Sequence, residues 1–271
     1  MNNDSPQKAL LVVTLVALVC SVLVSVAAVA LKPMQLRNQL VERSRNIVAL
    51  TGLVEPGSKL SDDEILEAVE QLDIRVVDLD SGEFDDSIDA AKFDKRTAAN
   101  DPNLSVQIPA EEDLASLGRR SKFAIVYLVW GDHGLDRLIM PIYGQGMWST
   151  LYGYIALEDD LNTIAAVTFY EQAETAGLGD QITRPEWQAR WAGRQIFDSG
   201  GNLRFKISTG MVADSSSAAR HEVDALTGAS VTGDSVTRII AYWFGPHGYQ
   251  PFVDALDSNQ PERAVAQRGP E

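Results

Sequence analysis

The sequence predicts an α+β protein in which a single N-terminal transmembrane helix precedes an antiparallel sheet with packed helices. Three observations support this prediction: an uninterrupted apolar run near the N-terminus, a series of short β-type segments in the middle of the chain, and amphipathic helical segments around them. The chain has 271 residues, which is enough to bury a hydrophobic core in one or two domains.

The apolar run Ala9–Leu31 contains no charged residue, Pro, Asn or Gln. Its 23 residues would form a helix about 35 Å long, enough to cross a bilayer. A cleaved signal peptide is the alternative, and the Ala-rich stretch 26–30 fits it, although the apolar region of a signal peptide is shorter. A helical pattern continues through 34–50. Basic residues such as Lys32 and Arg37 follow the span, so the positive-inside rule places the soluble part in the cytoplasm.

The composition excludes several classes of function. A net charge of -15 argues against nucleic-acid binding, which needs a basic surface, and disfavours docking on anionic lipids. Cys20 is the only cysteine, so no intramolecular disulfide can form. The three histidines are widely spaced, and we expect no metal site.

The remaining elements follow from local patterns. Ser61–Glu64 predicts a capping box that begins a helix. A second, short helix over 185–192 would place Trp187 and Trp191 on one face. Between 85 and 117 the chain is polar and weakly patterned, so we expect short helices and loops there. The expected strands are 74–79, 123–130, 138–143, 149–157 and 163–170, and the last four would be successive antiparallel neighbours in one sheet.

These segments divide the chain into consecutive parts. We expect an N-terminal cytoplasmic stub over 1–8, the transmembrane helix over 9–31, and a membrane-proximal helical or extended region over 32–120. The main domain would span 121–257. The polar residues that follow, 258–271, would form a flexible tail.

One segment, Asp224–Ser235, gathers hydroxyl and small side chains ahead of a helix whose apolar face carries Val236, Ile239 and Ile240. A loop that enters a helix N-terminus offers unpaired N–H groups and the positive end of the helix dipole, which together stabilise a phosphate. A plain turn with an N-cap is the alternative, since Ser, Thr and Gly are the usual residues of turns and caps. Neither a Walker A loop nor a GxGxxG fingerprint is present.

The pattern Asp-x-x-Thr-Gly-Ala-Ser-x-Thr, from Asp224 to Thr232, resembles the flavinylation motif of FMN-binding domains. The resemblance implies that a flavin transferase joins FMN to the Thr232 hydroxyl by a phosphoester bond during maturation. It also implies that Asp224 helps the transferase to recognise or activate the site. The intervening motif residues expected at the cofactor are Thr227, Gly228, Ala229 and Ser230.

Two further segments resemble parts of the same family that lie near the flavin. Glu174–Gly179 is similar to the family's Glu-Thr-Pro-Gly-Leu-Gly element, with Ala176 in place of Pro and Gln172 where a His is usual. Trp148 would lie near the isoalloxazine ring, unless it is an ordinary core tryptophan. The residues implied at the cofactor from these segments are Trp148, Ser149, Thr150, Glu174, Thr175, Gly177, Leu178 and Gly179.

Over nearly the whole chain the sequence resembles the C subunits of Na⁺-translocating NADH:quinone reductases, notably at 146–153 and 187–193. The resemblance implies a subunit of a bacterial inner-membrane complex that carries electrons one at a time from NADH towards ubiquinone through covalent FMN. The other subunits of the complex would be its partners, and Na⁺ export would be coupled elsewhere. No side chain is expected to act as a catalytic acid, base or nucleophile.

Three points stay open at this stage. The family implies a periplasmic flavin domain, which contradicts the charge rule, and we follow the family. The G subunits of Rnf-type complexes carry the same domain but lack most of 42–117. A non-redox anchored scaffold, whose Thr-rich loop carries nothing, is the alternative of a different class.

Overall fold

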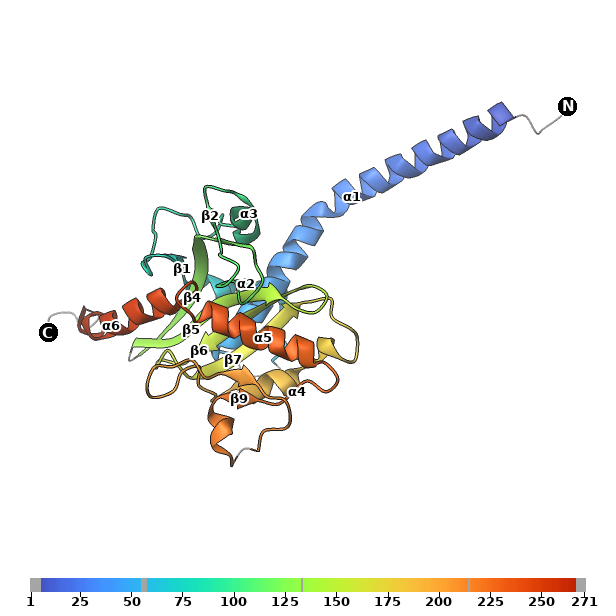
Figure 1. The fold of residues 1–271 in the computed structure, drawn as a ribbon. Coiled ribbons are helices and arrows are strands. Elements are labelled where there is room, and N and C mark those ends of the chain that lie inside the picture. Colours follow the sequence, from blue (N-terminus) through green and yellow to red (C-terminus); the bar gives the residue numbers. More distant parts are fainter. Residues whose placement is uncertain (1–5, 55–57, 133, 214, 267–271) are drawn as a thin grey trace. The chain divides into compact units, whose positions relative to one another are not determined.

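The computed structural model describes residues 6–54, 58–132, 134–213 and 215–266, except for the side chains of 259–266 (Figure 1). The chain forms two compact units, Met1–Arg45 and Asn46–Glu271. The helices are α1 (Pro6–Thr51), α2 (Asp62–Glu70), α3 (Lys95–Asn100), α4 (Pro185–Gln188), α5 (Ser230–Trp243) and α6 (Gln250–Ala266), with the 3-10 helices η1 (Gly179–Thr183), η2 (Ala189–Trp191) and η3 (Ser217–Arg220). The strands are β1 (Asp73–Asp78), β2 (Ser105–Gln107), β3 (Arg119–Ser121), β4 (Phe123–Gly131), β5 (Gly134–Gln145), β6 (Thr150–Leu157), β7 (Ile164–Glu171), β8 (Lys206–Ile207) and β9 (Glu222–Val223).

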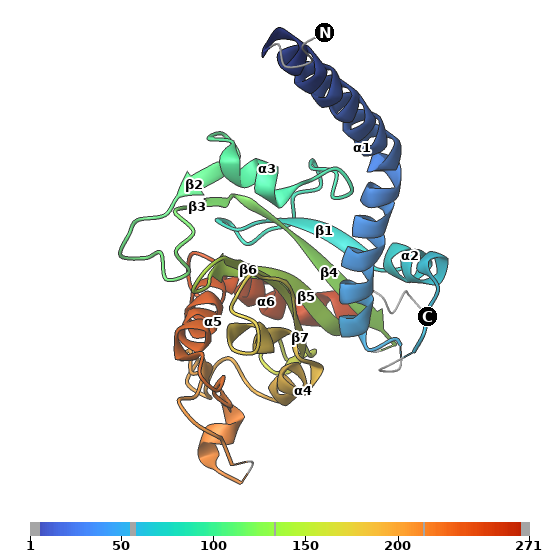
Figure 2. The same cartoon turned by 90° about the vertical axis from the view of Figure 1, so that its right-hand side faces the viewer.

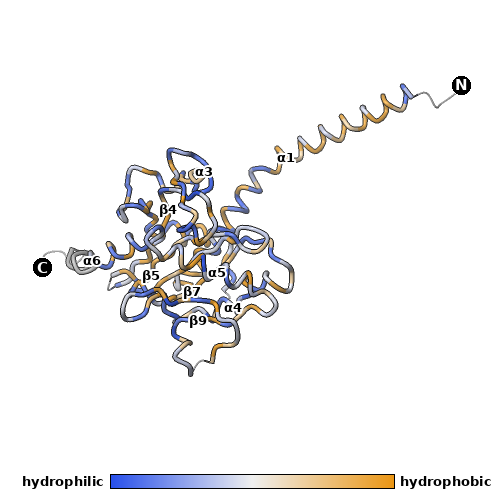
Figure 3. Tube along the Cα trace, viewed as in Figure 1, coloured by the Kyte–Doolittle hydropathy of each residue, from blue (hydrophilic) through white to orange (hydrophobic). Residues whose placement is uncertain are grey.

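The first unit consists of the N-terminal part of α1, and Figure 3 shows it as a run of apolar turns. The predicted continuation of the helix beyond the apolar run is confirmed, because α1 is unbroken to Thr51. By length and composition α1 is able to cross a membrane. It is consistent with a single-pass anchor.

The second unit is built on a five-stranded antiparallel sheet in the order β1-β4-β5-β6-β7. The consecutive strands β4 to β7 form the predicted meander, with pairs such as Gly144 opposite Leu151. β1 adds to its outer edge, where Asp78 pairs with Phe123. The predicted α+β class with an antiparallel sheet and packed helices is confirmed.

Both faces of the sheet are covered. On one face, side chains of β4 to β7 pack against α5 and α6, and Figure 2 shows these two helices together with α4 on that side. Ile239 and Ile240 of α5 are fully buried there. On the other face, Ile47 and Leu50 at the end of α1 pack on Tyr127 and other sheet residues. The sheet therefore holds α5 rigidly along its length, which fixes where the first turn of α5 lies.

The predicted capping box of α2 is present. Ser61 Oγ accepts the backbone N–H of Glu64, and Glu64 Oε2 accepts the backbone N–H of Ser61 at 2.8 Å. The hydrogen bonds from Ser61 lower the pKa of Glu64. A carboxylate with a lowered pKa stabilises the fold above its ordinary pKa, and this stabilisation is lost as the pH falls through the folded-state pKa.

Ser61→Ala is therefore expected to lower the free energy of unfolding by about 1 kcal/mol at neutral pH, the usual effect of losing an N-cap. The difference in the free energy of unfolding between the two chains should shrink in acid, because protonated Glu64 is a weaker acceptor for the hydrogen bonds of Ser61. Urea unfolding of both chains, at neutral pH and again below the ordinary pKa of glutamate, measures this. A pH-independent difference would contradict the role assigned to Glu64.

Two predictions about the middle of the chain were incomplete. The region 85–117 contains α3 and loops, as expected, but also β2, which pairs with β3. A strand of three residues carries no periodicity, and its partner lies outside the local segment, so no pattern marked it. The boundary predicted between 120 and 121 also does not separate compact parts, because β1 belongs to the same sheet as β4.

Smaller differences concern helix ends. The helix predicted over 185–192 is α4 continued by η2, and the rings of Trp187 and Trp191 pack 5.5 Å apart in the core. The tail predicted to be flexible from 258 is helical as far as Ala266, although Pro261 lies within this part of α6. The rest of that tail lies outside the described residues.

Candidate functional site

The motif Asp224–Thr232 runs from the end of β9 into the first turn of α5. The chain turns at Gly228, whose φ of +74° is readily adopted only by glycine, and α5 begins at Ser230. The whole motif was expected in a loop before the helix, which is wrong for its last residues, because they form the first turn of α5. Ser and Thr have modest helix propensity, but burial of Thr232 and Gly233 fixes this turn by packing.

Thr232 does not face solvent. Its side chain is only 1% exposed, and Oγ1 donates a hydrogen bond of 2.7 Å to Oε2 of Glu174. Glu174 is itself buried, at 8% exposure. The two segments that the resemblance placed at a cofactor therefore meet through a direct contact between these side chains.

The Glu174 carboxylate is held from a second direction by backbone groups. The N–H of Trp148 donates to Oε1 at 3.0 Å, and the N–H of Met147 donates to Oε2 at 3.3 Å. The N–H of Glu174 donates to Oε1 of Gln172 at 2.5 Å. Burying a carboxylate is costly unless it is hydrogen-bonded, and the N–H groups of Trp148 and Met147 together with the Thr232 hydroxyl satisfy both of its oxygens.

Two glycines shape the segment that faces Thr232. A Cβ on Gly179 would lie 2.7 Å from Thr232 Oγ1 and 2.8 Å from the Cβ of Glu174, closer than real Cβ atoms approach. Gly177 has a φ of +78°, in the left-handed region. Glycine at 179 lets the backbone approach the Thr232 hydroxyl closely, and glycine at 177 permits the left-handed turn beside it.

The same segment is tied to the motif by Gln181. Its Nε2 donates to the carbonyls of Leu178 at 2.9 Å and Thr227 at 3.2 Å. Leu178 also contacts the motif, because its Cδ2 lies 3.0 Å from the position that a Cβ on Gly228 would take. One side chain thus joins the two halves of the site.

Trp148 lies on the surface and is 65% exposed, so it is not a core tryptophan. Its indole Nε1 donates to Thr175 Oγ1 at 3.1 Å. The neighbouring Ser149 accepts the N–H of Ala173 on its Oγ at 2.7 Å. These bonds attach the turn between β5 and β6 to the Glu174–Gly179 segment.

Large apolar side chains are exposed on the segments that adjoin Thr232, although such side chains are usually buried. They form what we call the apolar rim: Met147, Trp148, Leu178, Met211 and Val231. A cavity of about 360 Å³ lies beside the motif and is lined by Thr227, Gly228 and Ser230 together with Met211 of the rim. Exposed apolar surface next to a concave site is typical of a surface that binds a ligand or a partner.

The segments that form the site lie within a known protein family. A family model described as "FMN-binding domain" matches residues 146–245, which include Trp148, Glu174 and Thr232. The C subunit of the Na⁺-translocating NADH-quinone reductase of Pseudomonas aeruginosa is 44% identical over 256 residues, covering 94% of this chain and 97% of that protein. The chain belongs to the family of these C subunits.

Other members of the C-subunit family are similar over comparable lengths. The C subunit from Neisseria meningitidis serogroup B is 41% identical, covering 95% of this chain and 96% of that protein. The crystal structure of NqrC from Shewanella oneidensis matches with a TM-score of 0.73 and 34% identity, over 82% of this chain and 98% of that one. This chain therefore contains the FMN-binding domain of the C-subunit family.

In this member of the C-subunit family, Asp224 faces other protein groups, and its side chain is only 13% exposed. Its Oδ1 accepts the N–H of Val212 at 2.6 Å, and its Oδ2 pairs with the guanidinium of Arg190. Its carbonyl accepts the indole N–H of Trp187 at 3.1 Å. Sequence reasoning missed Arg190, because nothing in its local pattern marks it as a partner of the motif.

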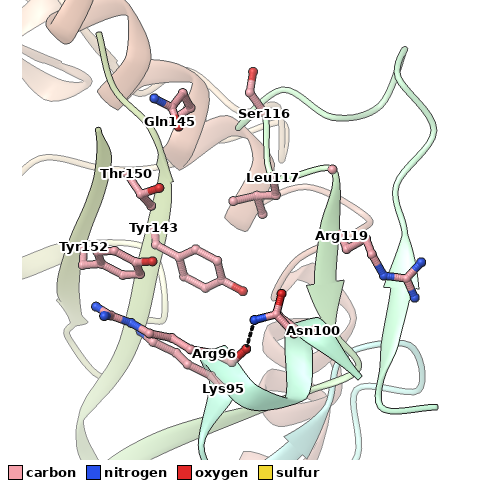
Figure 4. Close-up of a pocket in the computed structure, with 12 residues that line it drawn as sticks. Lys95, Arg96, Asn100, Ser116, Leu117, Arg119, Tyr143, Gln145, Thr150 and Tyr152 are labelled. Carbon is pink, nitrogen blue, oxygen red and sulfur yellow. Dashed lines mark hydrogen bonds between the residues drawn. The ribbon is translucent and has the colours of Figure 1, made fainter. Parts of the chain in front are cut away.

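Thr150, also expected at the cofactor, lines a different cavity, about 500 Å³ in volume (Figure 4). The rings of Tyr143 and Tyr152 stack there at 5.8 Å, and Lys95 Nζ lies 5.0 Å from the Tyr143 ring. Burial raises the pKa of Tyr143. Figure 4 shows the Tyr143 hydroxyl and the Asn100 amide pointing into this cavity. None of the motif residues lines this cavity.

Proposed function

We propose that this chain holds one FMN, joined covalently through its phosphate to Thr232, and that it serves as an electron carrier. Its place is in a membrane complex that oxidises NADH, reduces ubiquinone and exports Na⁺. The observation that carries the proposal is the position of Thr232 in the first turn of α5, in contact with Glu174, inside the segment matched by the FMN-binding family.

The residues present fit an FMN phosphoester in chemical kind. Thr232 supplies the acceptor hydroxyl at the start of a helix, where the dipole stabilises a phosphate. The N–H groups of Met147 and Trp148 are donors already engaged with an oxyanion, the Glu174 carboxylate. The apolar rim offers flat and aliphatic surface suited to an isoalloxazine ring.

When bound, the flavin supplies the one-electron chemistry, and the protein supplies its position and electrostatic surroundings. The sheet holds α5 and therefore Thr232 in place. Trp148, fixed by its bond to Thr175, and Leu178, fixed through Gln181, would restrict how the ring lies. No side chain of this protein needs to exchange a proton with a substrate for electrons to pass.

Attachment requires a flavin transferase and a flavin nucleotide whose phosphate bears a leaving group. The O–H bond of Thr232 is replaced by an O–P bond, and the hydroxyl proton and the leaving group depart. The tryptic peptide His221–Arg238 of protein made with the transferase should gain the mass of FMN less one water, localised to Thr232. An unmodified peptide, under conditions that flavinylate a known target, would refute the proposal and favour the non-redox scaffold.

We further propose that the amino end lies in the cytoplasm and the flavin domain in the periplasm. The charge bias around α1 points the other way but is small, since several basic residues lie well beyond the apolar run. Fusions at the C-terminus test this: alkaline phosphatase should be active, and fluorescence from a GFP fusion alone would contradict the topology.

Asp224 is expected to support attachment by holding the motif, not through contact with the transferase. Arg190→Ala removes its ion-pair partner and should cost about 1 kcal/mol of stability, because the guanidinium is half exposed. Under this view Arg190→Ala and Asp224→Asn both lower the yield of covalent flavin, measured by fluorescence of the denatured protein. If only Asp224→Asn loses flavin, the carboxylate itself is what the transferase recognises.

A further inference from the structure

The hydroxyl that receives the flavin is closed off by its own protein. Thr232 is 1% exposed, and its Oγ1 is covered by the Glu174 carboxylate on one side and by the backbone of Gly179 on another. A reagent as large as a flavin nucleotide cannot reach this oxygen in that arrangement. Some part of the site must therefore move before attachment, and the structure indicates which part.

We propose that Glu174 is a latch on the flavin site. Before attachment, its carboxylate covers the Thr232 hydroxyl and accepts the N–H groups of Met147 and Trp148. After attachment, the flavin phosphate accepts these two N–H groups in place of the carboxylate. This inference rests on the proposed function, since it assumes that Thr232 is the acceptor.

The chemistry of the contacts supports an exchange of one oxyanion for another. A carboxylate and a phosphodiester both accept hydrogen bonds from backbone N–H groups, and both are stabilised near the start of a helix. Glu174 already uses two such N–H groups together with the Thr232 hydroxyl. Attachment converts that hydroxyl from a donor into part of an anion. The carboxylate then loses a hydrogen bond and meets a like charge, so it leaves.

The segment that carries Glu174 is built to move without disturbing the core. Residues 175–178 are exposed, while Glu174 and Gly179 at its two ends are buried. Gly177 lies in the left-handed region, and Ala176 stands where the family has a proline, so φ is less restricted there. Hydrogen bonds from Gln181 and Trp148 and the packing of Leu178 beside Gly228 hold the closed arrangement, and all of these contacts are local to the site. The latch can open by a local change.

The first test is the rate of flavinylation of the full-length chain by the transferase, followed by the mass of the peptide His221–Arg238. Glu174→Gln keeps the shape but turns charge-assisted hydrogen bonds into weaker neutral ones, so the rate should rise about tenfold. Glu186→Gln is the matched control, an exposed glutamate in the same domain that should leave the rate unchanged. A rate that falls in Glu174→Gln would overturn the latch and make the carboxylate a group that attachment requires.

The second test is backbone hydrogen exchange at Met147 and Trp148 in the full chain, before and after flavinylation. Before attachment, both amides should be protected in the wild-type chain and exchange fast in Glu174→Ala. After attachment they should be protected in both chains, because the phosphate has replaced the carboxylate. If the Met147 and Trp148 amides still exchange fast in flavinylated Glu174→Ala, the phosphate does not replace the carboxylate as their acceptor, and the latch is refuted.

These results separate the latch from the proposed function. A wild-type chain that acquires no FMN refutes the function and the latch with it. Flavin on wild-type Thr232, combined with slower attachment in Glu174→Gln, leaves the function standing and removes the latch alone.

Discussion

Thr232→Ala is expected to give a folded chain that carries no covalent flavin. The hydroxyl of Thr232 is the one that the motif places in the first turn of α5, and alanine offers no oxygen for the phosphoester. Thr232→Ser keeps the oxygen and should retain the flavin. In Thr232→Ala the hydrogen bond to Glu174 is also lost. This should lower the free energy of unfolding by about 1–2 kcal/mol, because a buried charged acceptor loses a donor.

The matched control for this prediction is Ser235→Ala. Ser235 lies one turn further along α5 and is equally buried, but it does not contact Glu174 in the structure. Flavin fluorescence of the denatured protein and the mass of the peptide His221–Arg238 measure the outcome. Full flavin content in Thr232→Ala would show that another residue of the motif is the acceptor.

Much of the fold could be predicted from the sequence because its signals are local. The strands β4 to β7 follow one another in a meander, so each β-type segment pairs with its neighbour in sequence. Apolar runs such as 123–130 therefore indicated both the strand and its partner. The capping box at Ser61 likewise depends on residues within one turn.

The elements that were missed depend on contacts between distant segments. The pairing of β2 with β3, and the attachment of β1 to the same sheet as β4, join parts of the chain that no periodicity relates. The early start of α5 has the same origin, because the burial of Thr232 against Glu174 decides it. Propensity alone favours a loop at Ser, Val and Thr.

The candidate site shows the same limit. The resemblance supplied Thr232 and Glu174 as separate motif residues, but only the structure places their side chains in contact. The donors from Met147 and Trp148 are backbone N–H groups, which every residue except proline possesses, so no sequence pattern could reveal them. Thr150 came from the resemblance of the Trp148–Thr150 segment, and only the structure shows that it lines a cavity with Tyr143 and Tyr152.

Gly179→Ala is expected to have the second large effect, a loss of covalent flavin together with reduced stability. The added methyl would lie 2.7 Å from Thr232 Oγ1 and 3.0 Å from Glu174 Oε2, so at least one of these side chains must shift. Overpacking of this kind costs about 1–3 kcal/mol, and the same free energy applied to attachment corresponds to a loss of about fivefold to 150-fold.

Gly210→Ala is the matched control, since a Cβ there meets nothing within 4 Å. It should leave flavin content and unfolding unchanged. The comparison with Glu174→Gln is informative, because both changes weaken the contact between Glu174 and Thr232. The glutamine variant leaves the space beside the acceptor oxygen open and should speed attachment, whereas the methyl of Gly179→Ala fills that space and should block it. Equal flavin contents in Gly179→Ala and the wild-type chain would mean that the backbone at Gly179 retreats when the site opens, and that the glycine serves the closed arrangement only.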